Sequence, residues 1–202
     1  MSRGSTKYRR LAKRLGQLRT HLLFFLPDPP VSKLSYSERE LDSTRAFVVL
    51  AHAEIEAFCE ELVYEKAHAA KAAFDSNRKV QPVLRRMIAY YVAKNGRSWS
   101  EVMSPAPNIA NSAFQSYKDR IQKNHGVKRE NLEKLLYPLG VQERHLSPTW
   151  LADMDSFGTD RGAMAHTSIG VQRPPDPLTQ LRNVSQLLPG LLDLDRVFSR
   201  LH

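Results

Sequence analysis

The sequence predicts an all-α protein: a bundle of about four core helices, with short helices in the connections and a basic helix at the N-terminus. Apolar residues recur at spacings of three and four along most of the chain, as in helices that bury one face. No segment alternates convincingly between apolar and polar residues, as a half-buried strand would. The chain has 202 residues, 42% of them apolar, which is enough for one sizeable core.

The first expected helix covers residues 6–26 and is followed by a proline-rich link. Pro27, Pro29 and Pro30 end it, because a proline ring removes an amide donor and blocks the preceding turn. We therefore divide the chain into a basic amphipathic helix with its link, residues 1–30, and a helical domain, residues 31–202. The apolar stripe of the first helix consists of Tyr8, Leu11, Leu15, Leu18, Leu22 and Phe25.

A long helix is expected from Ser37 to about Phe74. Ser37 and Glu40 fit a capping box, in which two side chains satisfy the free amides of the first turn. The stripe that predicts burial on this helix consists of Leu41, Val48, Ala51, Ile55, Phe58 and Leu62.

Shorter helices are expected over about 82–94, 113–124 and 129–138. Residues 95–112 contain two prolines, a glycine and several cap-forming residues, which predicts a loop with at most one short turn. The motif SPTW at 147–150 is typical of a helix start. The last helix is expected over 177–201, with Pro189–Gly190 as the place where it could bend.

Positive charge is concentrated at the N-terminus. The net charge is +9, and residues 1–27 contain seven basic and no acidic residues, so the rest of the chain carries 9 − 7 = +2. Such a segment predicts attraction to nucleic acid or anionic lipid; the alternative is a solvated basic face without a specific partner. The residues that we expect to bind nucleic acid are Arg9, Arg10, Lys13 and Arg14.

Composition disfavours several kinds of site. The single cysteine, Cys59, excludes an internal disulfide and a cysteine-based zinc site. Glu65 and His68 form one Glu-x-x-His pair, whereas a di-iron bundle needs that motif twice, so we expect neither a metal nor a cofactor. The apolar run at 22–26 is too short for a membrane span or a signal peptide. These observations predict a cytoplasmic protein without a membrane partner.

The segment DRGAMAHTS, residues 160–168, sets Arg161 and His166 among small residues. In a continuous helix these two positions would stand about 140° apart. Gly158 and Gly162 allow the helix to break or restart near Arg161, with Thr159 or Asp160 as a new cap. A second copy of the chain is the other way to bring the two groups together.

Spacing alone does not select this pair, because the chain has five Arg–His pairs that are five to seven positions apart. We expect Arg45 and His52 to bracket a packed stripe, and Arg120 and His125 to mark a polar helix end. The remaining two pairs are Arg14 with His21 and Arg196 with His202.

Two segments resemble one known superfamily. LADMDSFGTDRGAMAHTS, residues 151–168, resembles the signature of HEPN proteins, in which Arg-x4-6-His lies on a late helix of an all-α bundle. RAFVVLAHAEIEAFCEELV, residues 45–63, is similar to the long second helix of that superfamily, and closest to its RiboL-PSP-like branch. The resemblance covers roughly residues 36–200. It implies a HEPN-like bundle and a metal-independent endoribonuclease, active at a composite site across a two-fold dimer. It also implies a prokaryotic toxin–antitoxin or antiviral defence system, with an antitoxin or regulatory protein as partner.

The resemblance assigns the chemistry to Arg161 and His166. A histidine can serve as acid or base near neutrality, and the planar fork of an arginine matches phosphate oxygens. Glu56, Glu54 and Asp160 are the candidates for orienting them.

Two alternatives to a ribonuclease stay open. Many active HEPN proteins have a polar residue directly after the arginine, where this chain has Gly162. This favours a catalytically silent module that binds RNA, a nucleotide or a protein. The other alternative is a helical binder of nucleic acid or membrane surfaces that uses residues 1–26.

Overall fold

The computed structural model describes residues 4–94, 105–166 and 174–201. Within those ranges the chain forms seven α-helices, two short 3₁₀ helices and no strand, which confirms the predicted all-α class. The α-helices are α1 (Thr6–Leu22), α2 (Glu38–Asn77), α3 (Pro82–Lys94), α5 (Ala106–Gln122), α6 (Arg129–Leu136), α7 (Pro148–His166) and α8 (Pro177–Arg200), and the 3₁₀ helices are η1 (Tyr137–Leu139) and η2 (Glu143–His145).

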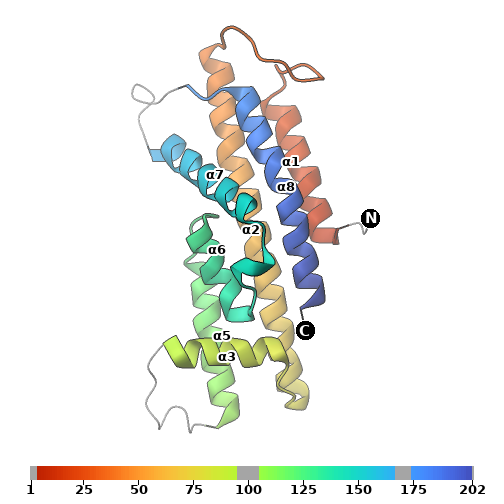
Figure 1. The fold of residues 1–202 in the computed structure, drawn as a ribbon, viewed down its shortest axis with the longest axis vertical. Helices are drawn as coiled ribbons and strands as arrows, with labels where there is room; N and C mark the ends of the chain where they lie inside the picture. Colours follow the sequence, from red (N-terminus) through yellow and green to blue (C-terminus); the bar gives the residue numbers. More distant parts are fainter. Residues whose placement is uncertain (1–3, 95–104, 167–173, 202) are drawn as a thin grey trace.

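The 40-residue helix α2 is the axis of the fold. Figure 1 shows α1 and α8 alongside it, α3 and α5 near its C-terminal end, and α7 crossing it. The capping box is confirmed: the hydroxyl of Ser37 accepts from the Glu40 amide, and the Glu40 carboxylate accepts from the Ser37 amide at 2.8 Å. All six residues of the predicted stripe are buried, so local periodicity identified the face of α2 that builds the core.

The basic helix α1 packs into the same core as the other helices. Leu11, Leu15 and Leu18 are buried against α2 and α8. The carboxylate of Asp195, on α8, accepts hydrogen bonds from the amide (2.7 Å) and the hydroxyl (2.5 Å) of Ser5. The start of α1 is therefore held against α8, close to the other end of the chain. The helix ends at Leu22, four residues earlier than expected.

The loop expected over residues 95–112 is wrong for its last part. Helix α5 begins at Ala106, so residues 106–112 are helical, whereas residues 95–104 lie outside the described ones. Ala110, Ala113 and Tyr117 form a buried stripe on α5. Alanines bury little apolar area, so this stripe is a weak helix signal in the sequence, and the two nearby prolines favoured a loop.

The break that the glycines allow in α7 does not occur, because the helix runs without interruption from Pro148 to His166. A glycine within a helix costs only about 1 kcal/mol relative to alanine. The packing of α7 against both α2 and α8 offsets that cost. Neither Thr159 nor Asp160 caps a new helix.

Helix α8 continues through Pro189. A Cβ atom at Gly190 would overlap the indole ring of Trp150, on α7. The indole Nε1 of Trp150 donates to the carbonyl of Leu187 at 3.2 Å. Gly190 is therefore the point of close approach between α7 and α8. In the segments that the structure describes, no helix is both long enough and apolar enough to cross a lipid bilayer.

Candidate functional site

Arg161 lies in a pocket of about 260 Å³ where α2, α7 and the connection between α5 and α6 meet. That connection lies against α7 (Figure 1). Gly158, Arg161 and Gly162 share one face of α7, because residues three and four apart are neighbours on a helix. The side chains that supply polar groups to the pocket are His52, His125, Lys128, Glu130, Asn131 and Arg161.

The guanidinium of Arg161 is held in the pocket without an acidic partner. It forms no ion pair with an acid of the described residues, and its Nε atom is buried with no hydrogen-bond partner there. An unsatisfied buried donor costs about 1–3 kcal/mol. The hydrogen-bonding capacity of this guanidinium, which lines the pocket, is therefore not used up by the described residues.

His52, on α2, lines the same pocket as Arg161, and its imidazole is neutral at pH 7. Its side chain is 2% exposed, and its Nδ1 atom has no hydrogen-bond partner among the described residues. Glu56 Oε2 is 3.7 Å from Nδ1, too far for a hydrogen bond. Burial, followed by the positive charge of Arg161, lowers the pKa of His52 to about 4. At neutral pH the imidazole therefore adds no charge beside the arginine.

Glu56 is held by the connection between α5 and α6. Its Oε1 accepts from the amide side chain of Asn124 at 3.3 Å, and the backbone of Gly126 also bonds to it. Burial and the neighbouring Glu60 raise the pKa of Glu56, and the charges of Arg161 and His125 act in the opposite direction. Glu56 thus interacts electrostatically with Arg161, but its hydrogen bonds go to the connection between α5 and α6.

A sequence model of one protein family, described as RiboL-PSP-HEPN, matches residues 9–181. The chain belongs to the RiboL-PSP-HEPN family. Membership confirms the predicted superfamily, which includes ribonucleases. The matched region begins in α1 and ends in α8, so it contains the whole pocket. No curated protein and no solved structure matches the chain.

The two motif residues of this RiboL-PSP-HEPN chain lie on the same unbroken helix. Arg161 is in the pocket, and His166 is the last residue of α7, with its side chain outside the described ones. Five residues on a continuous helix place the two positions about 140° apart around the axis. The helix by itself therefore does not direct the two positions toward one atom.

None of the three predicted supporting carboxylates lines the pocket. Glu54 pairs with Arg14 of α1, 2.9 Å from its Nε, and its role as a supporting residue stays a prediction. Asp160 does not line the pocket and forms no ion pair within the described segments. Only Glu56 lies beside the arginine. In the part of the chain that the structure describes, no three histidine, cysteine, aspartate or glutamate side chains gather as metal ligands would.

His52 and His125 are the site residues that the sequence left unrecognised. The sequence predicted that His52 would flank a packed stripe, whereas it is itself buried, and it predicted His125 as a residue at a helix end. Both histidines follow an arginine at the spacing of the motif, and no other feature of the sequence pointed to them as site residues. That both lie in the pocket of Arg161 depends on how α2 and α5 pack.

The four basic residues expected to bind nucleic acid fall into two pairs. Arg10 pairs with Glu61, and Arg14 with Glu54, so both lie along α2. Arg9 and Lys13 are exposed and form no ion pair with an acid in the described ranges. These two lie one turn apart, and of the four residues they are the ones that no acid of the described ranges neutralises; Arg10 is exposed too, but it is paired.

We expect Arg9→Ala with Lys13→Ala to weaken the salt dependence of RNA binding. Each contact to a phosphate of single-stranded RNA contributes about 0.7 to the slope of log K against log salt, so two lost contacts should lower it by about 1.4. Arg10→Ala with Arg14→Ala removes the same charge from the paired positions and should change the slope less. Fluorescence anisotropy titrations at several salt concentrations measure both slopes. Equal slopes for the two double variants would show that the unpaired residues contribute no more to RNA binding than the paired ones.

The neutral state of His52 predicts a loss of stability in acid. The unfolded chain binds a proton at His52 below pH 6.5, whereas the folded chain binds it only near pH 4. Between these values unfolding is favoured increasingly as the pH falls, by a total on the order of 3 kcal/mol. Urea unfolding of the wild type and of His52→Gln, followed from pH 7 to pH 4, measures this effect as a difference. A difference that stays constant with pH would show that His52 is not buried neutral.

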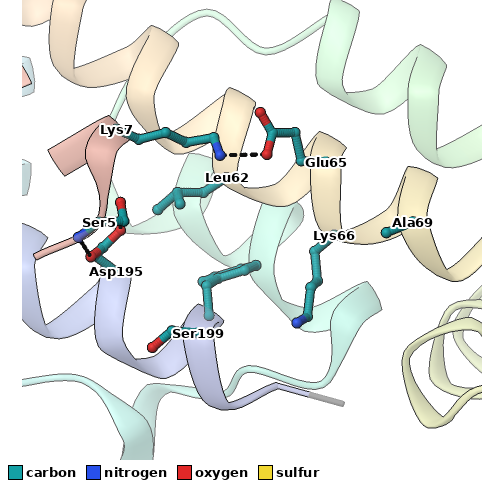
Figure 2. A pocket seen from close by; sticks show the side chains of 9 residues that line it. Ser5, Lys7, Leu62, Glu65, Lys66, Ala69, Asp195 and Ser199 are labelled. Carbon is teal, nitrogen blue, oxygen red and sulfur yellow. Dashed lines mark hydrogen bonds and ion pairs between the residues drawn. The ribbon is translucent and has the colours of Figure 1, made fainter. Parts of the chain in front are cut away.

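A second pocket of about 260 Å³ lies between α1, α2 and α8. Figure 2 shows Lys7 paired with Glu65 on one side, and Asp195 bonded to Ser5 on the other. Lys66, whose pKa is lowered by burial, is the one charged group of this pocket without a partner among the described residues. Because its other charges are satisfied within the chain, this pocket is less suited to an anionic ligand than the pocket of Arg161.

Proposed function

We propose that this protein is a metal-independent endoribonuclease, in which Arg161 and His166 of two copies form a shared cleavage site. The observation that supports the proposal is the guanidinium of Arg161, which lies in a pocket with a buried, unpartnered Nε atom. Membership of a family that includes ribonucleases makes RNA the expected ligand.

The chemistry requires two proton transfers and one stabilising cation. The 2′-oxygen attacks the phosphorus, and the bond to the 5′-oxygen breaks. One histidine takes the proton of the 2′-hydroxyl, and another gives a proton to the leaving 5′-oxygen. Arg161 neutralises the charge that develops on the phosphorane oxygens. A two-fold axis would supply both histidines as His166 of each copy, and the products carry 2′,3′-cyclic phosphate and 5′-hydroxyl ends.

The test is cleavage of mixed RNA in excess chelator by the wild type, His166→Ala and His21→Ala. His21 is a matched control, because it follows Arg14 at a motif-like spacing and is exposed on α1. We expect His166→Ala to lower the rate at least about 100-fold and His21→Ala to leave it unchanged. Cleavage by all three proteins, or by none, contradicts the proposal.

The proposal extends to the cellular setting. A ribonuclease of this kind would act in a prokaryotic toxin–antitoxin or antiviral defence system and would require a neutralising antitoxin or regulatory protein. Light scattering of the purified chain tests the dimer, because a shared site needs two copies. A stable monomer that still cleaves RNA would remove the second copy from the mechanism.

A second function, that of a silent RNA-binding HEPN module, is favoured by Gly162. A Cβ atom at this position would meet nothing within 4 Å. The fold therefore has room for the polar side chain that active relatives often carry, yet the chain lacks it. Tight RNA binding by a wild type that produces no cyclic-phosphate ends would establish this alternative.

A further inference from the structure

The wall of the pocket that faces Arg161 is itself basic. His125, Lys128 and Asn131 come from the connection between α5 and α6 and from the first turn of α6. Among the described residues that line the pocket, Glu130 is the one with an acidic side chain. This side chain is 70% exposed, and its carboxylate lies 3.5 Å from the ammonium of Lys134. The pocket therefore presents two permanent cations, Arg161 and Lys128, with a histidine beside them.

Lys128 is placed there by a glycine of α7. A Cβ atom at Gly158 would lie 2.7 Å from Cγ of Lys128, closer than atoms approach in folded proteins. Only a glycine thus lets the alkyl chain of Lys128 cross α7 one turn before Arg161. Lys128 forms no ion pair with an acid of the described residues, so its ammonium is available to a ligand.

Two polar side-chain atoms at this pocket have no hydrogen-bond partner in the described segments. They are Nε of Arg161 and Nδ1 of His52, a residue 98% buried among those that line the pocket. The N-terminus of α6 is not free to bind an anion. The carboxylate of Asp155 accepts a hydrogen bond from the backbone amide of Arg129, the first residue of α6, at 2.7 Å. An anion would therefore be held by side chains more than by the helix terminus.

We propose that Lys128 and His125 are further phosphate-binding residues, which with Arg161 hold one phosphodiester of an RNA chain within a single protomer. Asn131 completes this wall as a neutral donor whose amide also reaches Asn124, at 3.4 Å. The identity of the ligand as RNA rests on the proposed function, whereas the anion site rests on the geometry. The site requires no second copy, unlike the cleavage chemistry.

The test uses a fluorescent 2′-O-methyl RNA oligonucleotide without terminal phosphates. This RNA lacks the 2′-nucleophile, so its affinity is measured independently of cleavage. We expect Lys128→Ala to weaken binding about tenfold at low salt and to lower the salt slope by about 0.7. His125→Ala should also weaken binding. Lys123→Ala is the matched control, because it removes the same charge from the C-terminal end of α5 outside the pocket, and it should leave the affinity unchanged.

Two results would overturn the inference. One is an affinity and salt slope of Lys128→Ala equal to those of Lys123→Ala. The other is displacement of the oligonucleotide by micromolar nucleoside 5′-monophosphate, which would show a site for terminal phosphates. Circular dichroism confirms that the variants fold, and recovery of binding in Lys128→Arg supports a role for the charge. If the oligonucleotide binds as expected but ordinary RNA is not cleaved, the phosphate site stands and the proposed nuclease function fails.

Discussion

Replacement of Arg161 by alanine is expected to reduce RNA cleavage by about 10²–10³-fold, the usual effect of removing one preorganised donor to a developing oxyanion. Arg161→Lys should recover little of this loss. A lysine keeps the charge but has no Nε–H group and no planar fork, and Nε is the buried atom that lacks a partner. Initial rates of release of cyclic-phosphate ends, in chelator, measure both variants.

Arg196→Ala is the matched control for this experiment. Arg196 stands six positions before His202, so it has the motif spacing, but it lies near the end of α8 and pairs with Asp193 at 2.9 Å. Its removal should leave the rate within about twofold of the wild type, since it does not reach the pocket. Wild-type cleavage by Arg161→Ala would remove the arginine from the mechanism, and wild-type cleavage by Arg161→Lys would show that a point charge suffices.

The largest effect on stability is expected from Gly190→Ala, with a loss of about 3 kcal/mol. The added methyl group would overlap the rigid indole of Trp150, which is 4% exposed and hydrogen-bonded to the carbonyl of Leu187. The ring has no room to turn away, so α7 and α8 must separate. Chemical denaturation monitored by tryptophan fluorescence measures the change in the free energy of unfolding.

Gly16→Ala provides the matched comparison in α1. A Cβ atom at Gly16 would meet nothing within 4 Å, so the same substitution should stabilise the chain by about 0.5–1 kcal/mol through helix propensity alone. Equal effects at the two positions would mean that Trp150 does not pack against Gly190. The two variants together separate packing from propensity.

Local patterns were enough to predict the fold class and most helices, and a resemblance of two segments predicted the superfamily that the family model confirms. The stripe of α2 and its Ser37–Glu40 capping box are confirmed in detail, because periodicity and capping depend on residues three and four apart. The start of α5 was missed where small residues weaken that pattern. Arg161 was singled out by its surroundings and by a family resemblance, and its role in catalysis stays a prediction.

Contacts between distant segments could not be read from local patterns. Only the packing of α2, α5 and α7 places His52, His125 and Lys128 around Arg161, and only the packing of α1 on α2 pairs Arg14 with Glu54.

The glycines illustrate the same limit. In the sequence alone Gly158, Gly162 and Gly190 are equivalent interruptions of a helix. In the structure the first accommodates Lys128, the second faces open space and the third accommodates Trp150. The sequence by itself therefore determined which segments form helices and which faces they bury, because those properties are local. The tertiary structure decided which side chains meet, because that depends on neighbours that are remote along the chain.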